Sequence, residues 1–240
     1  MAQDSAGAEK FYGELLGWTF KHMDMGPSGT YRLIIANGRE QGGIFQMRTG
    51  DNIPSHWCGY VSVPDVDGAA KVAESKGGKL VFGPADIPDV GRFAYLLDPE
   101  GAAFVVWRDK RGDQDPRQTP GVGDFCWDTL TTSSGEGALE FYGTVVGWKR
   151  GKFGDAPGLF FAPGEGQDVI ADVEAPPPGA PSAWTTHVVV TNLDHARSKA
   201  ETLGAKILAR QIDVPTVGKM SIIADPWGAV ISLFEPQMPE

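Results

Sequence analysis

Hydrophobic residues near the start of the chain recur every three or four positions, and this spacing predicts a helix. Asp4 supplies an N-cap and Gly17 a stop signal, which together bracket the predicted helix. The apolar positions that share one face of this helix are Ala8, Phe11, Leu15 and Leu16. Extended segments are predicted to follow at residues 31–36 and 43–47. The chain therefore begins with a helix that leads into strands.

A second pattern begins after this unit, where residues 58–63 alternate in character as in a half-buried strand. A helix follows, capped by Asp65 and ended by Gly77-Gly78. Further strands are predicted at about residues 79–82, 92–97 and 103–107. The second half of the chain repeats this order, with helices capped by Ser134 and Asn192. The pattern predicts an α+β fold that contains four β-α-β-β-β units.

Short motifs of the first half return in the second half at a nearly constant distance. Pro54-Ser-His-Trp57 returns as Pro181-Ser-Ala-Trp184, and Asp98-Pro-Glu-Gly101 returns as Asp225-Pro-Trp-Gly228, both 127 positions later. Phe11-Tyr-Gly13 ending in Gly17-Trp18 returns 130 positions later as Phe141-Tyr-Gly143 ending in Gly147-Trp148. A constant offset indicates duplication of a folding unit. The sequence therefore predicts two domains, residues 1–109 and 121–240, joined by a linker at 110–120 that is rich in charge, Pro and Gly.

The duplication also shows that one predicted strand lacks its counterpart. A strand is predicted at residues 124–130, upstream of Ser134, whereas only three residues stand upstream of Asp4. The first unit is therefore predicted to lack its first strand. Either the chain is truncated, or another strand or a partner chain covers that edge, because an open sheet edge invites pairing. A homodimer would supply such a partner.

The composition excludes several classes of binding partner but does not indicate a reaction. The net charge of −10, without a basic cluster, argues against a nucleic-acid or anionic-membrane surface. The two cysteines are too few for a disulfide framework and favour the cytoplasm. No apolar run approaches the roughly 20 residues needed to span a bilayer. The N-terminal residues also have no basic or apolar region typical of a signal peptide.

Taken in order, these motifs resemble the vicinal oxygen chelate superfamily. The resemblance rests on Phe-Tyr-Gly…Gly-Trp after a helix, on Val63-Pro-Asp-Val-Asp67 before the next helix, and on Val90-Gly-Arg-Phe93…Asp98-Pro-Glu-Gly101. That group contains glyoxalase I, bleomycin resistance proteins and extradiol dioxygenases. The resemblance covers nearly the whole chain and implies two tandem glyoxalase-like domains whose strands wrap into open cups. It is less specific for chemistry, because this fold hosts many reactions.

The resemblance also implies where a metal ion would be held. In metal-using relatives one ligand lies seven residues before a helix N-cap, and a Glu lies seven residues past the Asp of Asp-Pro-x-Gly. The corresponding residues are Trp127, Cys58, Thr185, Val105 and Ser232. None is a His or a carboxylate, whereas a divalent ion needs several converging N or O ligands. We therefore expect no metal and no other cofactor. Cys58 is interpreted as a small apolar residue of the cup.

Residues two apart on a strand share a face, so the same resemblance predicts what lines the cups. The expected lining of the two cups comprises Cys58, Tyr60, Val105, Trp107, Trp127, Thr185, His187, Ser232 and Phe234. His187 is the candidate general base or hydrogen-bond anchor, although a merely buried histidine explains it as well. Tyr60 occupies the equivalent position in the first copy. Arg92 and Lys219, also equivalent, would meet an anionic ligand or remain solvated.

Three functional hypotheses follow. The first is a metal-independent protein that encloses a small, largely apolar or aromatic metabolite, with Tyr60 and His187 as anchors. The second is a lyase, isomerase or oxygenase that works through His187 or through an atypical metal site. The third is that one half only stabilises the other or forms a dimer interface, and the missing strand points to the N-terminal half.

Overall fold

A computed structural model describes residues 1–26, 29–48, 50, 53–112 and 119–237 of the chain. The chain divides into two compact units, each containing segments of both sequence halves. Unit 1 comprises Met1–Trp57, Arg117–Cys126 and Thr186–Glu240, and unit 2 comprises Cys58–Pro116 and Trp127–Thr185. The units therefore differ from the contiguous segments 1–109 and 121–240 that the duplication suggests. Part of the predicted linker, residues 113–118, lies outside the described residues.

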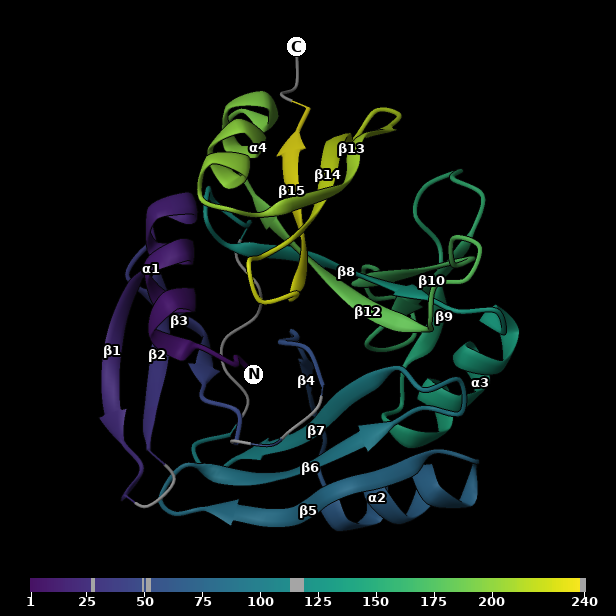
Figure 1. Ribbon diagram of the computed structural model, residues 1–240. Helices are drawn as coiled ribbons and strands as arrows, with labels where there is room; N and C mark the ends of the chain where they lie inside the picture. The colour runs from purple at the N-terminus through teal and green to yellow at the C-terminus, as the bar shows by residue number, and fades with distance from the viewer. Residues whose placement is uncertain (27–28, 49, 51–52, 113–118, 238–240) are drawn as a thin grey trace. The chain divides into compact units, whose positions relative to one another are not determined.

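Unit 1 contains two helices and two groups of strands (Figure 1). Helix α1 (Ser5–Leu16) packs on a sheet with the order β1-β2-β3, and helix α4 (Leu193–Thr202) packs on strands with the order β13-β14-β15-β12. The first group is β1 (Thr19–Asp24), β2 (Thr30–Ala36) and β3 (Arg39–Phe45). The second is β12 (Ala183–Val189), β13 (Lys206–Val214), β14 (Gly218–Ala224) and β15 (Val230–Pro236).

Unit 2 repeats this arrangement with two more helices (Figure 1). Helix α2 (Val66–Ser75) packs on strands ordered β4-β7-β6-β5, and helix α3 (Gly135–Val145) packs on β9 and β10 of strands ordered β8-β11-β10-β9. The first group is β4 (Gly59–Ser62), β5 (Lys79–Ile87), β6 (Gly91–Leu97) and β7 (Ala103–Asp109). The second is β8 (Phe125–Thr131), β9 (Lys149–Gly151), β10 (Leu159–Ala162) and β11 (Ala171–Glu174). The unit boundary falls inside β8 and β12.

The helix starts follow the predicted capping chemistry at three of four positions. The Asp4 carboxylate accepts a hydrogen bond from the Gly7 N–H at 2.9 Å, and Asp65 and Asn192 cap their helices in the same way. Ser134 makes no such bond. Gly17 ends α1 at φ 73°, a left-handed conformation that costs glycine little.

Each unit has a hydrophobic core between its helices and the sheet faces they cover. In unit 1 this core includes Phe11, Ile34, Ile223 and Leu233, and in unit 2 it includes Leu96, Phe104, Leu130, Phe141 and Phe161. All of these side chains are at most 4% exposed. Fully burying such a side chain contributes about 1.5–3 kcal/mol, so these clusters dominate the stability of each unit.

The repeated motifs meet in a buried hydrogen-bond network within each unit. In unit 1 the Tyr12 hydroxyl donates to the Asp225 carboxylate at 3.0 Å and accepts from the Trp57 indole N–H at 3.0 Å. In unit 2 Tyr142, Asp98 and Trp184 repeat these bonds at 3.1 and 2.8 Å. In each network the Asp comes from one sequence half and the Tyr and Trp from the other. This cross-pairing is the physical reason why the units do not follow the sequence halves.

Asp98 and Asp225 also form tight turns. Asp98 Oδ1 accepts from the backbone N–H groups of Glu100 and Ala102, and Asp225 repeats both bonds with Trp227 and Ala229. Burial raises the pKa of both carboxyl groups, and it raises the pKa of Tyr142 still further from its ordinary value. The motifs are therefore structural.

One strand near the start of the chain was not predicted. Strand β1 was missed because residues 19–24 show no apolar alternation and only two of the six are even half-buried. Among the described residues no strand precedes α1, as predicted; Ala2 forms a single parallel bridge to Gln46. None of the helices in the described part of the chain is long and apolar enough to cross a membrane.

Candidate functional site

Each sheet has one face against a helix and one face away from it, which we call the open face. In unit 2 the open face of β4-β7-β6-β5 carries four register partners in one row across the strands. These residues, the aromatic row, are Phe82, Tyr95, Val105 and Tyr60. Ala94, Leu96, Phe104 and Val106, which alternate with them, lie in the core. The sheet therefore presents rings on the side away from its helix.

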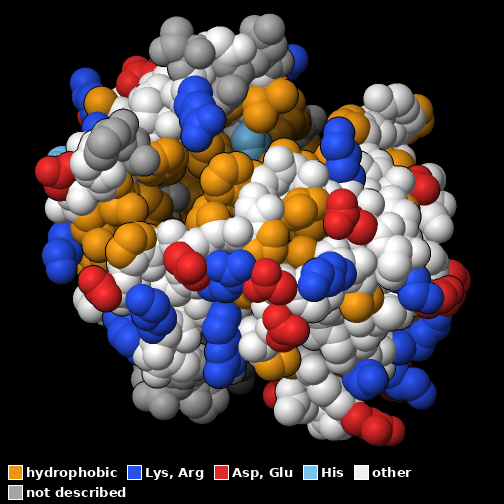
Figure 2. Space-filling model, turned by 90° about the horizontal axis from the view of Figure 1, so that it is seen from below, with side chains coloured by type: hydrophobic (Ala, Val, Ile, Leu, Met, Phe, Trp, Pro, Cys, Tyr) orange, Lys and Arg blue, Asp and Glu red, His pale blue; other side chains and the backbone are white. Residues whose placement is uncertain are grey.

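Several of these rings are accessible. Tyr60 is 61% exposed and Phe82 is 50% exposed, although aromatic residues usually lie inside. The Tyr60 ring contacts Trp107 edge-on at a centroid distance of 6.1 Å, and Phe82 stacks on Phe93 at 5.7 Å. Hydrophobic side chains gather in patches on the face drawn in Figure 2. Accessible rings in contact with one another form a surface that suits an apolar ligand.

The equivalent row in unit 1 has smaller side chains, and two of its four residues are buried. Its residues are Ala209, Ile222, Ser232 and His187, again register partners across neighbouring strands. His187 is 4% exposed and Ser232 is 0% exposed. Burial lowers the pKa of His187 to about 4, so the imidazole is neutral near pH 7. His187 and Tyr60 thus occupy equivalent positions in opposite environments.

Strand order explains this difference. Strand β12, which carries His187, lies between β15 and β8, whereas β4, which carries Tyr60, is the edge strand of its sheet. Among the described residues, no strand pairs with the outer edge of β4 as β8 pairs with β12. Tyr60 is exposed because its strand has no such neighbour within its sheet.

The positions expected to hold a metal do not fit one. Val105 and Ser232 are buried, and burial raises the pKa of the Cys58 thiol to about 12, which keeps it protonated. Trp127 carries no ligating group, and Thr185 is a half-buried residue of β12. Within the described ranges no group of three or more His, Cys, Asp or Glu could hold a metal ion. The donor set therefore does not match the metal site of metal-using relatives.

Trp107 and Phe234 are equivalent residues on the open faces of their strands. A methyl group at Gly91 would overlap the Trp107 ring, and one at Gly218 would overlap the Phe234 ring. Each glycine therefore leaves room for an aromatic ring close to its strand. Trp127, on the open face of β8, donates its indole N–H to Asp172 at 2.9 Å.

Arg92 and Lys219, which were expected either to meet an anionic ligand or to remain solvated, are both paired with carboxylates. Arg92 alternates with the open-face residues and donates to Asp67, which lies on α2, at 2.7 and 2.9 Å. These bonds lower the pKa of Asp67. Lys219 lies on the helix-facing side of β14 and pairs with Glu235 at 3.3 Å. Because alternate residues of a strand face opposite sides of the sheet, both cations lie on the helix-facing sides of their sheets.

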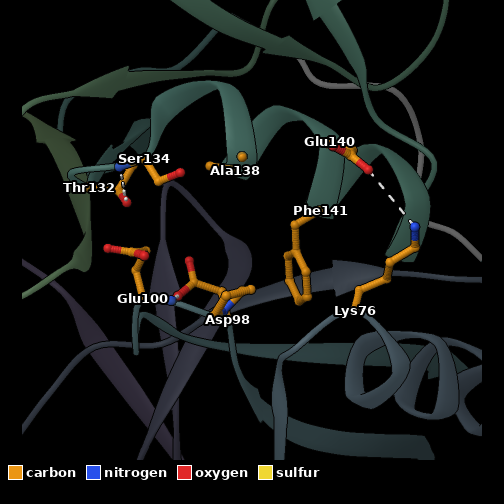
Figure 3. Close-up of a pocket in the computed structure, with 10 residues that line it drawn as sticks. Lys76, Asp98, Glu100, Thr132, Ser134, Ala138, Glu140 and Phe141 are labelled. Atoms are coloured by element: carbon orange, nitrogen blue, oxygen red, sulfur yellow. Dashed lines mark hydrogen bonds and ion pairs between the residues drawn. The ribbon is translucent and has the colours of Figure 1, made fainter.

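A separate cavity of about 210 Å³ lies in unit 2 at the start of α3 (Figure 3). Glu100, Ser134, Phe141 and the Lys76–Glu140 pair are among its lining residues. The repeat equivalent of Glu100 is Trp227, whose indole lies so close to Gly7 that a methyl group there would overlap it. The cavity therefore exists because a carboxylate replaces a large ring, and the Glu100 carboxylate accepts from Ser133 at its edge.

Several open-face residues were missed at the level of sequence. Phe82 and Tyr95 lay inside predicted strands, and the two-residue alternation applied there would have found them. The pattern gave no strand boundaries around Phe153, Phe160 and Asp172. It therefore could not predict which face of a sheet these residues occupy.

Comparison with known proteins agrees with this architecture. A family model described as Glyoxalase/Bleomycin resistance protein/Dioxygenase superfamily matches residues 1–106 and 127–233. A Mycobacterium tuberculosis (strain CDC 1551 / Oshkosh) protein named "Putative glyoxylase CFP32" is 32% identical over 97% of this chain and 91% of its own length. The "Anthracycline biosynthesis protein DauV" of Streptomyces sp. (strain C5) is 27% identical over 97% and 89%.

Among solved structures, the Mn(II)-bound glyoxalase from Novosphingobium aromaticivorans is similar with a TM-score of 0.62. Its sequence identity is 16%, and the match covers 98% of this chain and 79% of that chain. This similarity supports the fold alone. With two repeats matched over most of its length, the chain belongs to the Glyoxalase/Bleomycin resistance protein/Dioxygenase superfamily, also known as the vicinal oxygen chelate superfamily.

Proposed function

We propose that this protein binds a small, largely apolar or aromatic metabolite on the open face of the β4-β7-β6-β5 sheet of unit 2, without the metal ion of its metal-using relatives. The observation that carries the proposal is that two rings of the aromatic row, Tyr60 and Phe82, are at least half exposed, and that they contact Trp107 and Phe93, respectively. Aromatic side chains bury 150–250 Å² each and dominate the energetics of binding surfaces. Covering even part of these rings with a flat ligand is therefore favourable.

The metal-independent part of the proposal is supported by the residues that replace the ligands. A protonated Cys58, Val105 and Trp127 offer no anionic or imidazole donor, so ligand affinity would come from apolar contact and a few hydrogen bonds. The proposal places the protein in the cytoplasm, where two free cysteines are expected. One relative is named for anthracycline biosynthesis, which supports a role with small molecules.

A catalytic role through His187 has weaker support. A general base works best with a pKa near the operating pH, whereas burial holds the pKa of His187 at about 4. The ring is also only 4% exposed, so substrate would reach it only after a rearrangement of unit 1. The geometry therefore favours binding over proton transfer.

Isothermal titration calorimetry with 1-naphthalenemethanol, a neutral aromatic probe, tests the proposal. We expect saturable binding that weakens about ten-fold in Tyr60→Ala and in Trp107→Ala, because each loses part of an aromatic contact of about 1–2 kcal/mol. Leu208→Ala is the matched control, since Leu208 is a 48% exposed apolar residue of unit 1. Absence of saturable binding, or an equal loss in the control variant, would refute the proposal.

A further inference from the structure

The second sheet of unit 2 carries a different set of side chains on its open face. Gly151, Phe160, Asp172 and Thr129 are register partners in one row across β9, β10, β11 and β8. Ala171, Phe161 and Leu130, which alternate with them, belong to the core. Trp127 precedes Thr129 by two residues and shares its face. A carboxylate thus lies among aromatic residues on the side of the sheet that faces away from α3.

The rings of this face contact one another. The Phe153 ring lies edge-on to Trp127 at a centroid distance of 5.9 Å and tilted against Phe160 at 6.0 Å. Phe153 is 40% exposed, which is unusual for a phenylalanine, while Trp127 and Phe160 are half-buried beneath it. We call Trp127, Phe153, Phe160 and Asp172 the carboxylate–aromatic cluster.

Asp172 is held in a fixed orientation. Its Oδ1 accepts hydrogen bonds from the Trp127 indole N–H at 2.9 Å and from the Thr129 hydroxyl at 2.6 Å. Its Oδ2 accepts none from the described residues. Both donors are neutral, so they orient the carboxylate and leave its charge uncompensated.

A second carboxylate adds to this charge. Glu174 lies two residues further along β11, on the same face, and no ion pair in the described part of the chain involves Asp172 or Glu174. Burial, followed by repulsion from Asp172, raises the pKa of Glu174. By contrast, the carboxylate of Asp67 in the same unit is paired with an arginine.

We propose that the carboxylate–aromatic cluster binds the protonated amine of an aromatic ligand. The inference rests on the proposed function, because it assumes that the ligand is aromatic, and adds that the ligand is cationic. The ammonium group would donate to Asp172 Oδ2 and lie against the electron-rich faces of Trp127 and Phe153. A neutral ligand can donate a hydrogen bond to Asp172 but lacks the positive charge that strengthens this bond and attracts the ring faces, and an anionic ligand is repelled by the two carboxylates.

Two probes that differ in one group test the inference. These are 1-naphthylmethylamine, which is an ammonium ion at neutral pH, and the neutral 1-naphthalenemethanol. The protein is labelled with 5-fluorotryptophan, and its ¹⁹F NMR spectrum is followed during each titration. Spectra of Trp107→Phe and Trp127→Phe assign the two resonances that report on the two open faces of unit 2. The Trp107 signal reports on the proposed function and the Trp127 signal on the cluster.

We expect the amine to shift the Trp127 resonance and to bind about ten-fold more tightly than the alcohol. Asp172→Asn keeps the acceptor for Trp127 and Thr129 but removes the charge, so it should abolish this ten-fold preference. Asp168→Asn is the control, because it removes the same charge from an exposed loop position just before β11. The melting temperature of each variant shows whether it folds.

The outcomes are distinguishable. If both probes shift Trp107 while the amine leaves Trp127 unmoved or binds no more tightly than the alcohol, the inference is overturned and the proposed function stands. If neither probe shifts either resonance at millimolar concentration, both are overturned. A preference for the amine that survives in Asp172→Asn, or disappears equally in Asp168→Asn, also contradicts the inference.

Discussion

His187 makes the stability of this protein depend on pH in a way that one substitution can isolate. The imidazole is 4% exposed, and burial lowers its pKa from 6.5 to about 4. In the unfolded chain the same group is protonated at its ordinary pKa of about 6.5. The unfolded state therefore binds a proton between these values and the native state does not. The contribution of His187 is fully present above pH 6.5 and is lost as the pH falls towards 4.

The magnitude follows from the size of the shift. One pKa unit corresponds to about 1.4 kcal/mol, so the full shift amounts to about 3 kcal/mol, reached near pH 4. At pH 5, where the unfolded histidine is almost fully protonated, about 2 kcal/mol of unfolding free energy is already lost. Asp98 and Asp225, whose pKa values burial raises, act in the opposite direction over the acidic range. A difference between wild type and variant removes their contribution.

Urea denaturation at pH 7 and pH 5 measures this effect. His187→Gln cannot titrate, so we expect wild type to lose about 2 kcal/mol more than this variant between the two pH values. His195→Gln serves as the control, because His195 is an exposed residue of α4, and it should behave as wild type. Equal losses in wild type and His187→Gln would show that the imidazole is accessible to protons in the native state, and would refute the assignment of His187 as a buried residue of unit 1.

Three further predictions concern the motifs and the thiol. Tyr142→Phe leaves the Asp98 carboxylate and the Trp184 indole N–H without the hydroxyl that they share. Urea denaturation should therefore show that the free energy of unfolding falls by about 1–3 kcal/mol. An unchanged free energy of unfolding would contradict the structural role of the network. Gly7→Ala should lower the free energy of unfolding by about 1–3 kcal/mol, because the new methyl group overlaps Trp227. At the equivalent Gly137 a methyl group contacts only the rotatable hydroxyl of a serine, so Gly137→Ala should change this free energy by less than about 1 kcal/mol. Cys58, which is half-buried and has a thiol pKa of about 12, should react with an aromatic disulfide at pH 8 far more slowly in the native protein than after denaturation, and equally rapid native reaction would show that its pKa is not raised.

The fold was largely readable from the sequence because its signals are local. The N-cap of Asp4 and the left-handed stop at Gly17 depend only on neighbouring residues, and both occur in the structure. The constant offset between copies identified the duplication, and the order of motifs identified the superfamily. Core positions such as Phe11 and Leu15 followed from helical spacing alone.

The sequence did not indicate which distant segments of the chain come together in each unit. Nothing local to Tyr12 indicates that its hydroxyl meets Asp225 from the far end of the chain. Repeat equivalence also failed to predict environment, since Tyr60 is exposed on an edge strand while His187 is buried in a central one. Long-range strand order decides both properties.

The most direct test of the account is the affinity of metal-free protein for 1-naphthalenemethanol. Protein treated with EDTA and verified by elemental analysis is compared, by calorimetry, with the same protein supplied in turn with Zn²⁺, Mn²⁺, Ni²⁺ and Fe²⁺. The account predicts saturable binding with affinities that agree within about two-fold, because apolar contact supplies the free energy. Binding that appears only with one stoichiometrically bound metal would contradict it.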